Sequence, residues 1–402
     1  MKLIFVALGI FVCLTLVGCA GARFTTKGGW SSPVVSSLEE GQKAIYVGSQ
    51  EGRLLALNTF GRLLWSFPDQ TKGESALGTV LYGSPAVGDK QVYFGTYEGE
   101  LYSIDRKTGY KTSEWDVNPI VMGEGIHVVG GPAFVNSKQC YGRVRGAVDG
   151  GMLLVGSSDG KIHAYCVGDG SLAWRVETLG EIWGSPVVQD DTVFFGSQDN
   201  RMYAVSISQG VLKWAQPFKT GGAIISGPLV VGDKLFFGAL DGKLYALNKE
   251  TGISVWSQPF DAEDWLWSSP INEGENLYVV TVKGKVISLD VNTGRVRWST
   301  DLKTMVIASP VLAEKQGSKR LVVATKEGEI AVLRTSNGIE DGGRIPVSDG
   351  DNGEVKIKAG LGVSGSVIYI NTMDPWTVQA VDLNLGGNSL WVCPPSCGQR
   401  GE

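Results

Sequence analysis

Residues 235–252 read LFFGALDGKLYALNKETG and are followed by Trp256. The segment contains an aromatic run that ends at Gly238, an Asp241-Gly242 pair, a second run of alternating apolar residues and a Thr-Gly pair. Asp-Gly between two alternating apolar runs is a strong β-hairpin signal, because both turn positions favour a positive φ. Related segments recur about every forty residues along the chain, which predicts a repeat protein whose unit is a small antiparallel sheet.

Three markers define how many units there are. The residues that end the aromatic strand are Gly48, Gly95, Gly156, Gly196, Gly238, Val280, Ala324 and Asn371. The residues that open the units are Pro33, Pro85, Pro132, Pro186, Pro228, Pro270, Pro310 and Leu361. The tryptophans that close them are Trp65, Trp115, Trp174, Trp214, Trp256, Trp298 and Trp391, and the seventh unit has none. Four short strands in about forty residues are typical of a propeller blade, so residues 30–392 are predicted to form an all-β, eight-bladed β-propeller of four-stranded antiparallel blades.

The N-terminus has the features of an export signal. Lys2 precedes an apolar run from Leu3 to Leu16 that is short for a membrane span. The run ends in Leu-Val-Gly followed by Cys19, which resembles the lipobox of bacterial lipoproteins. We therefore expect residues 1–18 to be a signal peptide, Cys19 to carry lipid, residues 19–29 to be a tether and residues 393–402 to be a C-terminal tail. An ordinary cleaved signal or an anchor is the alternative.

Composition agrees with an exported protein. Net charge is -5 and no basic stripe is present, which argues against nucleic acid as a partner. Beyond Cys19, an oxidising compartment favours disulfides among the remaining cysteines, with free thiols as the alternative. Cys140 lies in an insertion between the first two strands of the third unit, and Cys166 ends that unit's third strand, on the same face of an up-and-down sheet. The predicted pairs are Cys140–Cys166 and Cys393–Cys397.

One loop resembles a weak calcium site. Asp349, Asp351 and Glu354 lie between the seventh and eighth units, where their oxygens could hold Ca²⁺ at the low affinity of extracellular modules. The loop is shorter than an EF-hand loop and lacks its spacing, so a solvated acidic turn is the alternative. The two histidines, His127 and His163, offer little for a transition-metal site.

The repeat also identifies a family. Residues 246–256, 288–298 and 103–115 resemble the tryptophan-docking motif of the pyrroloquinoline-quinone (PQQ) propellers, over nearly the whole mature chain. That repeat is shared by quinoprotein dehydrogenases and by the outer-membrane protein assembly factor B (BamB) lipoproteins, and the second group is more similar in lipobox, length and blade number. The dehydrogenases carry an adjacent Cys-Cys pair, which this sequence lacks, and no other catalytic motif is present. The resemblance therefore implies a protein that is not an enzyme and has no PQQ cofactor.

The expected function is binding through one rim of the propeller. Turns between second and third strands share a face with the loops between blades, and this face would present Asp199 and Asp241 together with Trp183, Trp265 and Trp267. The alternatives are that the tryptophans line the core or channel and that the aspartates serve only the turns. By resemblance, the partner would be a barrel-assembly subunit or its unfolded clients, bound by a monomeric propeller anchored to the outer membrane on its periplasmic side. In a host with a single membrane, the outer face of the cytoplasmic membrane would replace it. A quinone-dependent oxidoreductase and a cell-surface polysaccharide or matrix module are the alternative functions.

Overall fold

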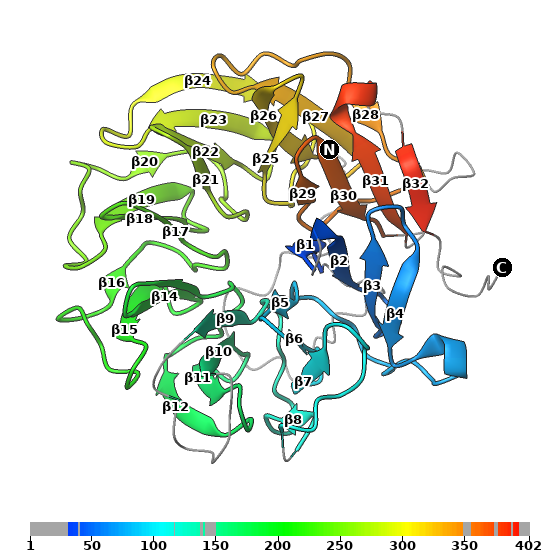
Figure 1. The fold of residues 1–402 in the computed structure, drawn as a ribbon. Coiled ribbons are helices and arrows are strands. Elements are labelled where there is room, and N and C mark those ends of the chain that lie inside the picture. Colours follow the sequence, from blue (N-terminus) through cyan, green and yellow to red (C-terminus); the bar gives the residue numbers. More distant parts are fainter. Residues whose placement is uncertain are drawn as a thin grey trace, which may run out of the picture.

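The structure is a ring of eight sheets around a central axis (Figure 1). It is a computed structural model that describes residues 31–38, 41–115, 117–136, 140, 150–348, 355–373, 377–386 and 389–393. Each sheet contains four antiparallel strands that follow one another in the chain. Within the described ranges, helical structure is limited to short 3-10 turns such as Gln70–Lys72 and Leu383–Leu385. The predicted all-β, eight-bladed propeller is thus confirmed.

The strand bounds follow chain order, blade by blade. Blade 1 contains β1 (Val34–Ser37), β2 (Lys43–Gly48), β3 (Leu54–Asn58) and β4 (Leu63–Phe67), and blade 2 contains β5 (Ala86–Val87), β6 (Gln91–Gly95), β7 (Glu100–Asp105) and β8 (Ile120–Val121). Blade 3 contains β9 (Ala133–Asn136), β10 (Gly151–Gly156), β11 (Lys161–Cys166) and β12 (Leu172–Glu177), and blade 4 contains β13 (Val187–Gln189), β14 (Thr192–Ser197), β15 (Arg201–Ser206) and β16 (Phe218–Lys219). Blade 5 contains β17 (Leu229–Val231), β18 (Lys234–Gly238), β19 (Lys243–Asn248) and β20 (Phe260–Asp261), and blade 6 contains β21 (Ile271–Glu273), β22 (Asn276–Val280), β23 (Lys285–Asp290) and β24 (Val296–Asp301). Blade 7 contains β25 (Val311–Lys315), β26 (Ser318–Ala324), β27 (Glu329–Arg334) and β28 (Ile345–Pro346), and blade 8 contains β29 (Gly362–Ser364), β30 (Val367–Asn371), β31 (Val378–Asp382) and β32 (Ser389–Cys393).

The middle strands of each blade form the core. In β18 and β19 the residues from Leu235 to Gly238 and from Leu244 to Leu247 are all buried, although their side chains point alternately to the two faces. Both faces are covered because a neighbouring blade packs on each side. This arrangement explains why the sequence shows solid apolar runs in these strands and not simple alternation of apolar and polar residues.

A tryptophan of one blade docks on the next blade at seven of the eight interfaces. Trp256 of blade 5 donates a hydrogen bond from Nε1 to the Val291 carbonyl, at 3.2 Å, and its ring lies against Gly294. A Cβ on Gly294 would lie 2.8 Å from the indole, and the residue has a φ of +69°, so both contact and conformation require glycine. The other six indoles donate to Arg106, Val167, Ile207, Lys249, Thr335 and Thr59.

The ring closes between blades 8 and 1 through side chains. Trp391 of β32 donates from Nε1 to the Thr59 carbonyl at 2.9 Å, and Asn371 of β30 donates from Nδ2 to the Ser31 carbonyl at 2.8 Å. Apolar residues of β2 and β3 pack against those of β30 and β31. Every sheet consists of consecutive strands, so the first and last blades are each complete sheets and share no strand where they meet.

The cysteines were predicted in two pairs. Cys140 and Cys166 form a disulfide with their Cα atoms 5.5 Å apart, as the position of the insertion in blade 3 predicts. Cys393 at the end of β32 is disulfide-bonded, and its predicted partner Cys397 lies outside the described residues.

Several predictions fall on other residues outside the described ranges. These are the signal peptide over residues 1–18, lipidation of Cys19, the tether over residues 19–29, and the acidic loop with Asp349, Asp351 and Glu354. They remain predictions. Within the described ranges, no helix combines the length and the apolar character needed to cross a bilayer.

Candidate functional site

On one face of the ring, the interblade loops that enter blades 2 to 8 are each bonded to a turn of the blade that follows. Val282, in the turn between β22 and β23, donates its backbone N–H to the Trp265 carbonyl at 3.0 Å, and Gln198 donates to Glu181 at 2.9 Å. The same bond recurs for Tyr97 with Val80, Ser158 with His127, Leu240 with Ala223, Lys326 with Met305 and Met373 with Lys356. The loops and the turns between second and third strands therefore form one continuous surface, which we call the rim face.

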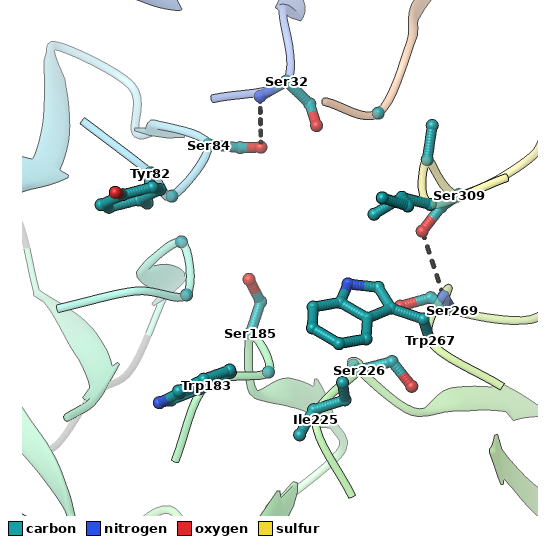
Figure 2. Close-up of a pocket in the computed structure, with 18 of the residues that line it drawn as sticks. Ser32, Tyr82, Ser84, Trp183, Ser185, Ile225, Ser226, Trp267, Ser269 and Ser309 are labelled. Carbon is teal, nitrogen blue, oxygen red and sulfur yellow. Dashed lines mark hydrogen bonds between the residues drawn. The ribbon is translucent and has the colours of Figure 1, made fainter. Parts of the chain in front are cut away.

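A pocket of about 280 Å³ opens at the axis of the ring (Figure 2). Its wall contains the aromatic rings of Tyr82, Trp183 and Trp267, and Figure 2 shows the Trp267 indole extending inward from its loop. Serine hydroxyls alternate with these rings, and two of the serines bind neighbouring loops: Ser84 Oγ accepts from Ser32 N at 3.2 Å, and Ser309 Oγ accepts from Ser269 N at 3.0 Å. The hydroxyls thus tie successive blades together around the axis.

Among the described residues that line this axial pocket, one carries a charge. Lys358 stands three residues before Leu361, the position that Trp183 and Trp267 occupy in their own units. The described lining contains indole, phenol, hydroxyl, amine and backbone groups but no carboxylate. The sequence could have indicated this lysine as a pocket residue. Lys358 precedes Leu361 by three residues, as Trp183 and Trp267 precede the opening prolines of their units.

An aromatic stack extends from the axial pocket along the rim face. The Tyr82 and Tyr97 rings are 5.3 Å apart, and Tyr97 stacks on the His127 imidazole at 4.1 Å. His127 Nδ1 donates to the Tyr97 carbonyl at 2.7 Å. Burial raises the pKa of Tyr97, and the nearby carboxylates Glu181 and Glu98 raise it further. Sequence reasoning did not find this stack because its residues come from different blades.

The three predicted tryptophans lie in different environments. Trp183 is half-buried and donates from Nε1 to Glu181 Oε2 at 2.6 Å, and Trp267 faces the axial pocket. Trp265 is 37% exposed on the rim face. Leu179 and Met305, which occupy other interblade loops, also expose large apolar side chains there. The structure therefore makes Trp265 the tryptophan best placed to contact a partner.

The two predicted aspartates are used within the chain. Asp199 accepts from the Tyr203 hydroxyl at 2.5 Å and from Leu179 N at 3.1 Å, and its side chain is only 3% exposed. Asp241 accepts from the Tyr245 hydroxyl at 2.5 Å. The pKa values of Tyr203 and Tyr245 lie well above the ordinary tyrosine value. Burial is the larger cause, and the hydrogen bonds to Asp199 and Asp241 raise them further. The carboxylates hold turns and interblade loops in place, which is the structural alternative that the sequence left open.

Potential metal ligands do not cluster within the described part of the chain. No group of three or more His, Cys, Asp or Glu side chains is placed to hold a metal ion there. The described part of the rim face combines exposed apolar side chains, the aromatic stack and hydrogen-bonded turns.

Comparisons with known proteins relate most of the chain to one family. The sequence profile described as outer membrane protein assembly factor BamB matches residues 25–144, 135–223 and 214–360. The BamB of Yersinia pestis is 24% identical over 182 residues, which is 42% of this chain and 40% of that protein. Quinohemoprotein alcohol dehydrogenase ADH IIB of Pseudomonas putida is 30% identical over 140 residues, which is 34% of this chain and 19% of the dehydrogenase. The matches thus span less than half the length of these curated relatives.

Solved structures share the fold. The crystal structure of BamB from Moraxella catarrhalis superposes with a TM-score of 0.64 at 17% identity, covering 86% of this chain and 92% of that one. The computationally designed Ika8 protein superposes with a TM-score of 0.66 at 16% identity. At such identities the likeness shows the fold alone.

Proposed function

This chain belongs to the family of outer membrane protein assembly factor BamB, and on that premise we propose that it is a non-enzymatic scaffold for outer-membrane protein assembly. In this proposal the propeller binds a protein partner through its rim face, either a subunit of the barrel-assembly machinery or an unfolded client. The observation that carries the proposal is the exposed Trp265 on a face that the backbone bonds between loops and turns hold rigid. Exposed aromatic anchors on rigid loops are typical of protein interfaces.

The chemistry of the rim face indicates what kind of partner fits. Trp265, Leu179 and Met305 offer apolar surface, and the exposed turn residues Glu98 and Glu327 add negative charge on the same face. Apolar anchors on a face that also carries carboxylates suit a partner segment that combines apolar and basic side chains. In this proposal Asp199 adds no negative charge to the exposed surface, because its carboxylate is buried and accepts hydrogen bonds from Tyr203 and Leu179.

Membrane attachment is part of the proposal. The lipobox that ends at Cys19 supports lipidation, and the family supports a place on the periplasmic side of the outer membrane. Several acyl chains would make the attachment durable, since each buried methylene contributes about 0.8 kcal/mol. Mass spectrometry of the membrane-extracted protein tests it, because an unmodified N-terminus at any other residue would contradict lipidation of Cys19.

The partner proposal is tested by recovery of the complex after mild crosslinking. We expect Trp265→Ala to reduce recovery of a barrel-assembly subunit about tenfold, since aromatic anchors commonly contribute 1–2 kcal/mol or more. Phe60→Ala is the matched control: Phe60 is 78% exposed in the turn between β3 and β4, on the opposite face of the ring. Equal recovery with both variants would overturn the rim-face assignment, and the absence of any such subunit with the unmodified chain would overturn the function.

A quinone-dependent oxidoreductase is the second candidate, favoured by the match to the Pseudomonas putida dehydrogenase. The family's quinone is accompanied by calcium, which prefers carboxylate oxygens among its ligands. The described lining of the axial pocket has hydroxyls and Lys358 but no carboxylate, so the donor set does not fit that pair. Titration with the quinone and calcium distinguishes the candidates: a tight, absorbance-active complex would contradict the scaffold proposal.

A further inference from the structure

A second cavity, of about 470 Å³, lies between blades 2 and 3. On one side it is bounded by β8 and its flanks, which contribute Ile120, Val121 and Met122, and on the other by Leu172 at the start of β12. Val121 and Leu172 are largely exposed, so the cavity opens to solvent. Its volume is within the range of small-molecule sites, roughly 300–1,000 Å³.

Three hydrogen-bond donors line the blade 3 side of this cavity. His163 of β11 pairs in register with Arg175 of β12, and the His163 ring stacks on Tyr165 with 6.1 Å between centroids. His163 is 5% exposed, and its Nε2 has no hydrogen-bond partner. Among the described residues, the Arg175 guanidinium and the Tyr165 hydroxyl also have none. His163 Nε2 is closed off from the cavity, but the Tyr165 hydroxyl is not, although Tyr165 is only 6% exposed. Buried polar groups are normally satisfied, so an unpaired tyrosine hydroxyl at the cavity wall indicates a missing acceptor.

The local charges favour an anionic acceptor. The nearest carboxylate is Asp159, whose Oδ2 lies 3.6 Å from His163 Nε2. Asp159 already accepts from the Ser157 hydroxyl at 2.5 Å and from the Lys161 ammonium at 3.2 Å, so its charge is compensated. Burial lowers the pKa of His163, which keeps the imidazole neutral at pH 7 and leaves Arg175 as the permanent positive charge of the cavity.

We propose that this cavity binds an acyl carboxylate of the fatty-acid type. The carboxylate accepts hydrogen bonds from Arg175 and Tyr165, and the acyl chain lies against Ile120, Val121 and Leu172. The donors of the cavity all lie on its blade 3 side, where a single anionic head group can bind them. The apolar side chains that line the rest of the cavity can then contact an apolar tail. A peptide fits less well, because its backbone amides need partners along their whole length and the rest of the described lining presents side-chain carbon.

The proposal is tested by calorimetric titration of the mature chain with decanoate below its micelle concentration. Decanamide, which keeps the chain and removes the charge, and acetate, which keeps the charge and removes the chain, are the comparison ligands. We expect decanoate to bind at least tenfold more tightly than either. Equal binding of decanoate and decanamide would overturn the proposal without any variant.

Variants then locate the head group. We expect Arg175→Gln to weaken decanoate binding about tenfold and Tyr165→Phe, which removes only a hydroxyl, about threefold. Arg295→Gln is the matched control, because Arg295 is an exposed arginine in a turn of blade 6. Unchanged affinity in both cavity variants would place the ligand elsewhere and contradict the site, and thermal denaturation of each variant confirms that the propeller remains folded.

Discussion

The interface between blades 5 and 6 and the interface between blades 7 and 8 solve one packing problem in two ways. At the first, Trp256 fills the space above the Gly294 turn and bonds to the Val291 carbonyl. At the second, Gly342 occupies the position of the tryptophan, four residues after the turn glycine of blade 7. Gly386 is the turn glycine of blade 8 and corresponds to Gly294, but nothing lies within 4 Å of a Cβ built on it. The turn of blade 8 is therefore retained although no indole docks on it.

Polar groups hold the second interface and its surroundings. Asp341, next to Gly342, binds Arg320 at 2.7 Å, and its backbone carbonyl accepts from the Lys315 ammonium at 2.7 Å. The adjoining hairpin reaches blade 8, where Gln316 N donates to Asn384 Oδ1 at 2.7 Å. Apolar residues still pack between the two blades. The difference teaches that a blade interface can form without the indole, through apolar packing and the bond from Gln316 to Asn384, beside a charged cluster that lies within blade 7.

The largest expected effect comes from removing a docked indole. Trp256→Ala should lower the free energy of unfolding by about 3–5 kcal/mol, because a buried aromatic ring and its hydrogen bond are lost and a cavity remains. Urea denaturation followed by circular dichroism measures the change. Trp265→Ala, at an exposed site, is the control and should change it by less than about 1 kcal/mol. Equal effects would mean that docking adds nothing to stability.

The two turn glycines provide the next comparison. Gly294 and Gly386 have nearly the same φ, +69° and +71°, so alanine should cost about 1–2 kcal/mol of backbone strain at either position. A Cβ on Gly294 meets the Trp256 ring at 2.8 Å, which should add about 1–3 kcal/mol of overpacking. We therefore expect Gly294→Ala to be the more destabilising of the two by denaturation. An equal cost would show that the indole moves aside freely.

The smallest expected effect concerns the charges. Hydrogen bonding from Arg320, with Lys315 nearby, holds the pKa of Asp341 below its ordinary value. A carboxyl with a lowered folded-state pKa contributes stability above its unfolded pKa, roughly 4, and loses that contribution as the pH falls through the folded value. Asp341→Asn should therefore cost about 1 kcal/mol at pH 7 and low salt, and less at pH 3 or in 0.5 M NaCl.

Denaturation curves at both pH values and both salt concentrations check this prediction. Glu250→Gln, at an exposed carboxylate in a regular turn of blade 5, is the control and should show no such dependence. A constant cost of Asp341→Asn across all conditions would mean that the side chain acts through packing and not through charge.

Most of the architecture could be predicted because each blade is defined by sequence markers that lie close together and recur at a fixed spacing. The Asp241-Gly242 turn, the opening prolines and the closing tryptophans each recur at one period, and the unit without a tryptophan is the one with Gly342. The Cys140–Cys166 disulfide could be predicted for the same reason, since both cysteines belong to one blade.

The candidate site was less predictable because it depends on contacts between units. The pairing of Asp199 with Tyr203 had a signal in the sequence, because Asp241 and Tyr245 repeat the same spacing of four residues. The Tyr97–His127 stack joins residues of two blades, so no local pattern shows it. Tyr165 and Arg175 reach the same cavity only through the pairing of β11 with β12.

The way the ring closes bears on how the chain folds. Each sheet uses four consecutive strands, so a blade can form as soon as its own forty or so residues are available, with contacts of short range in sequence. The contacts of Trp391 with Thr59 and of Asn371 with Ser31 span almost the whole chain, and they can form only after blade 8 exists. Assembly can then proceed as a growing arc of finished blades, with a single late step that turns the arc into a ring.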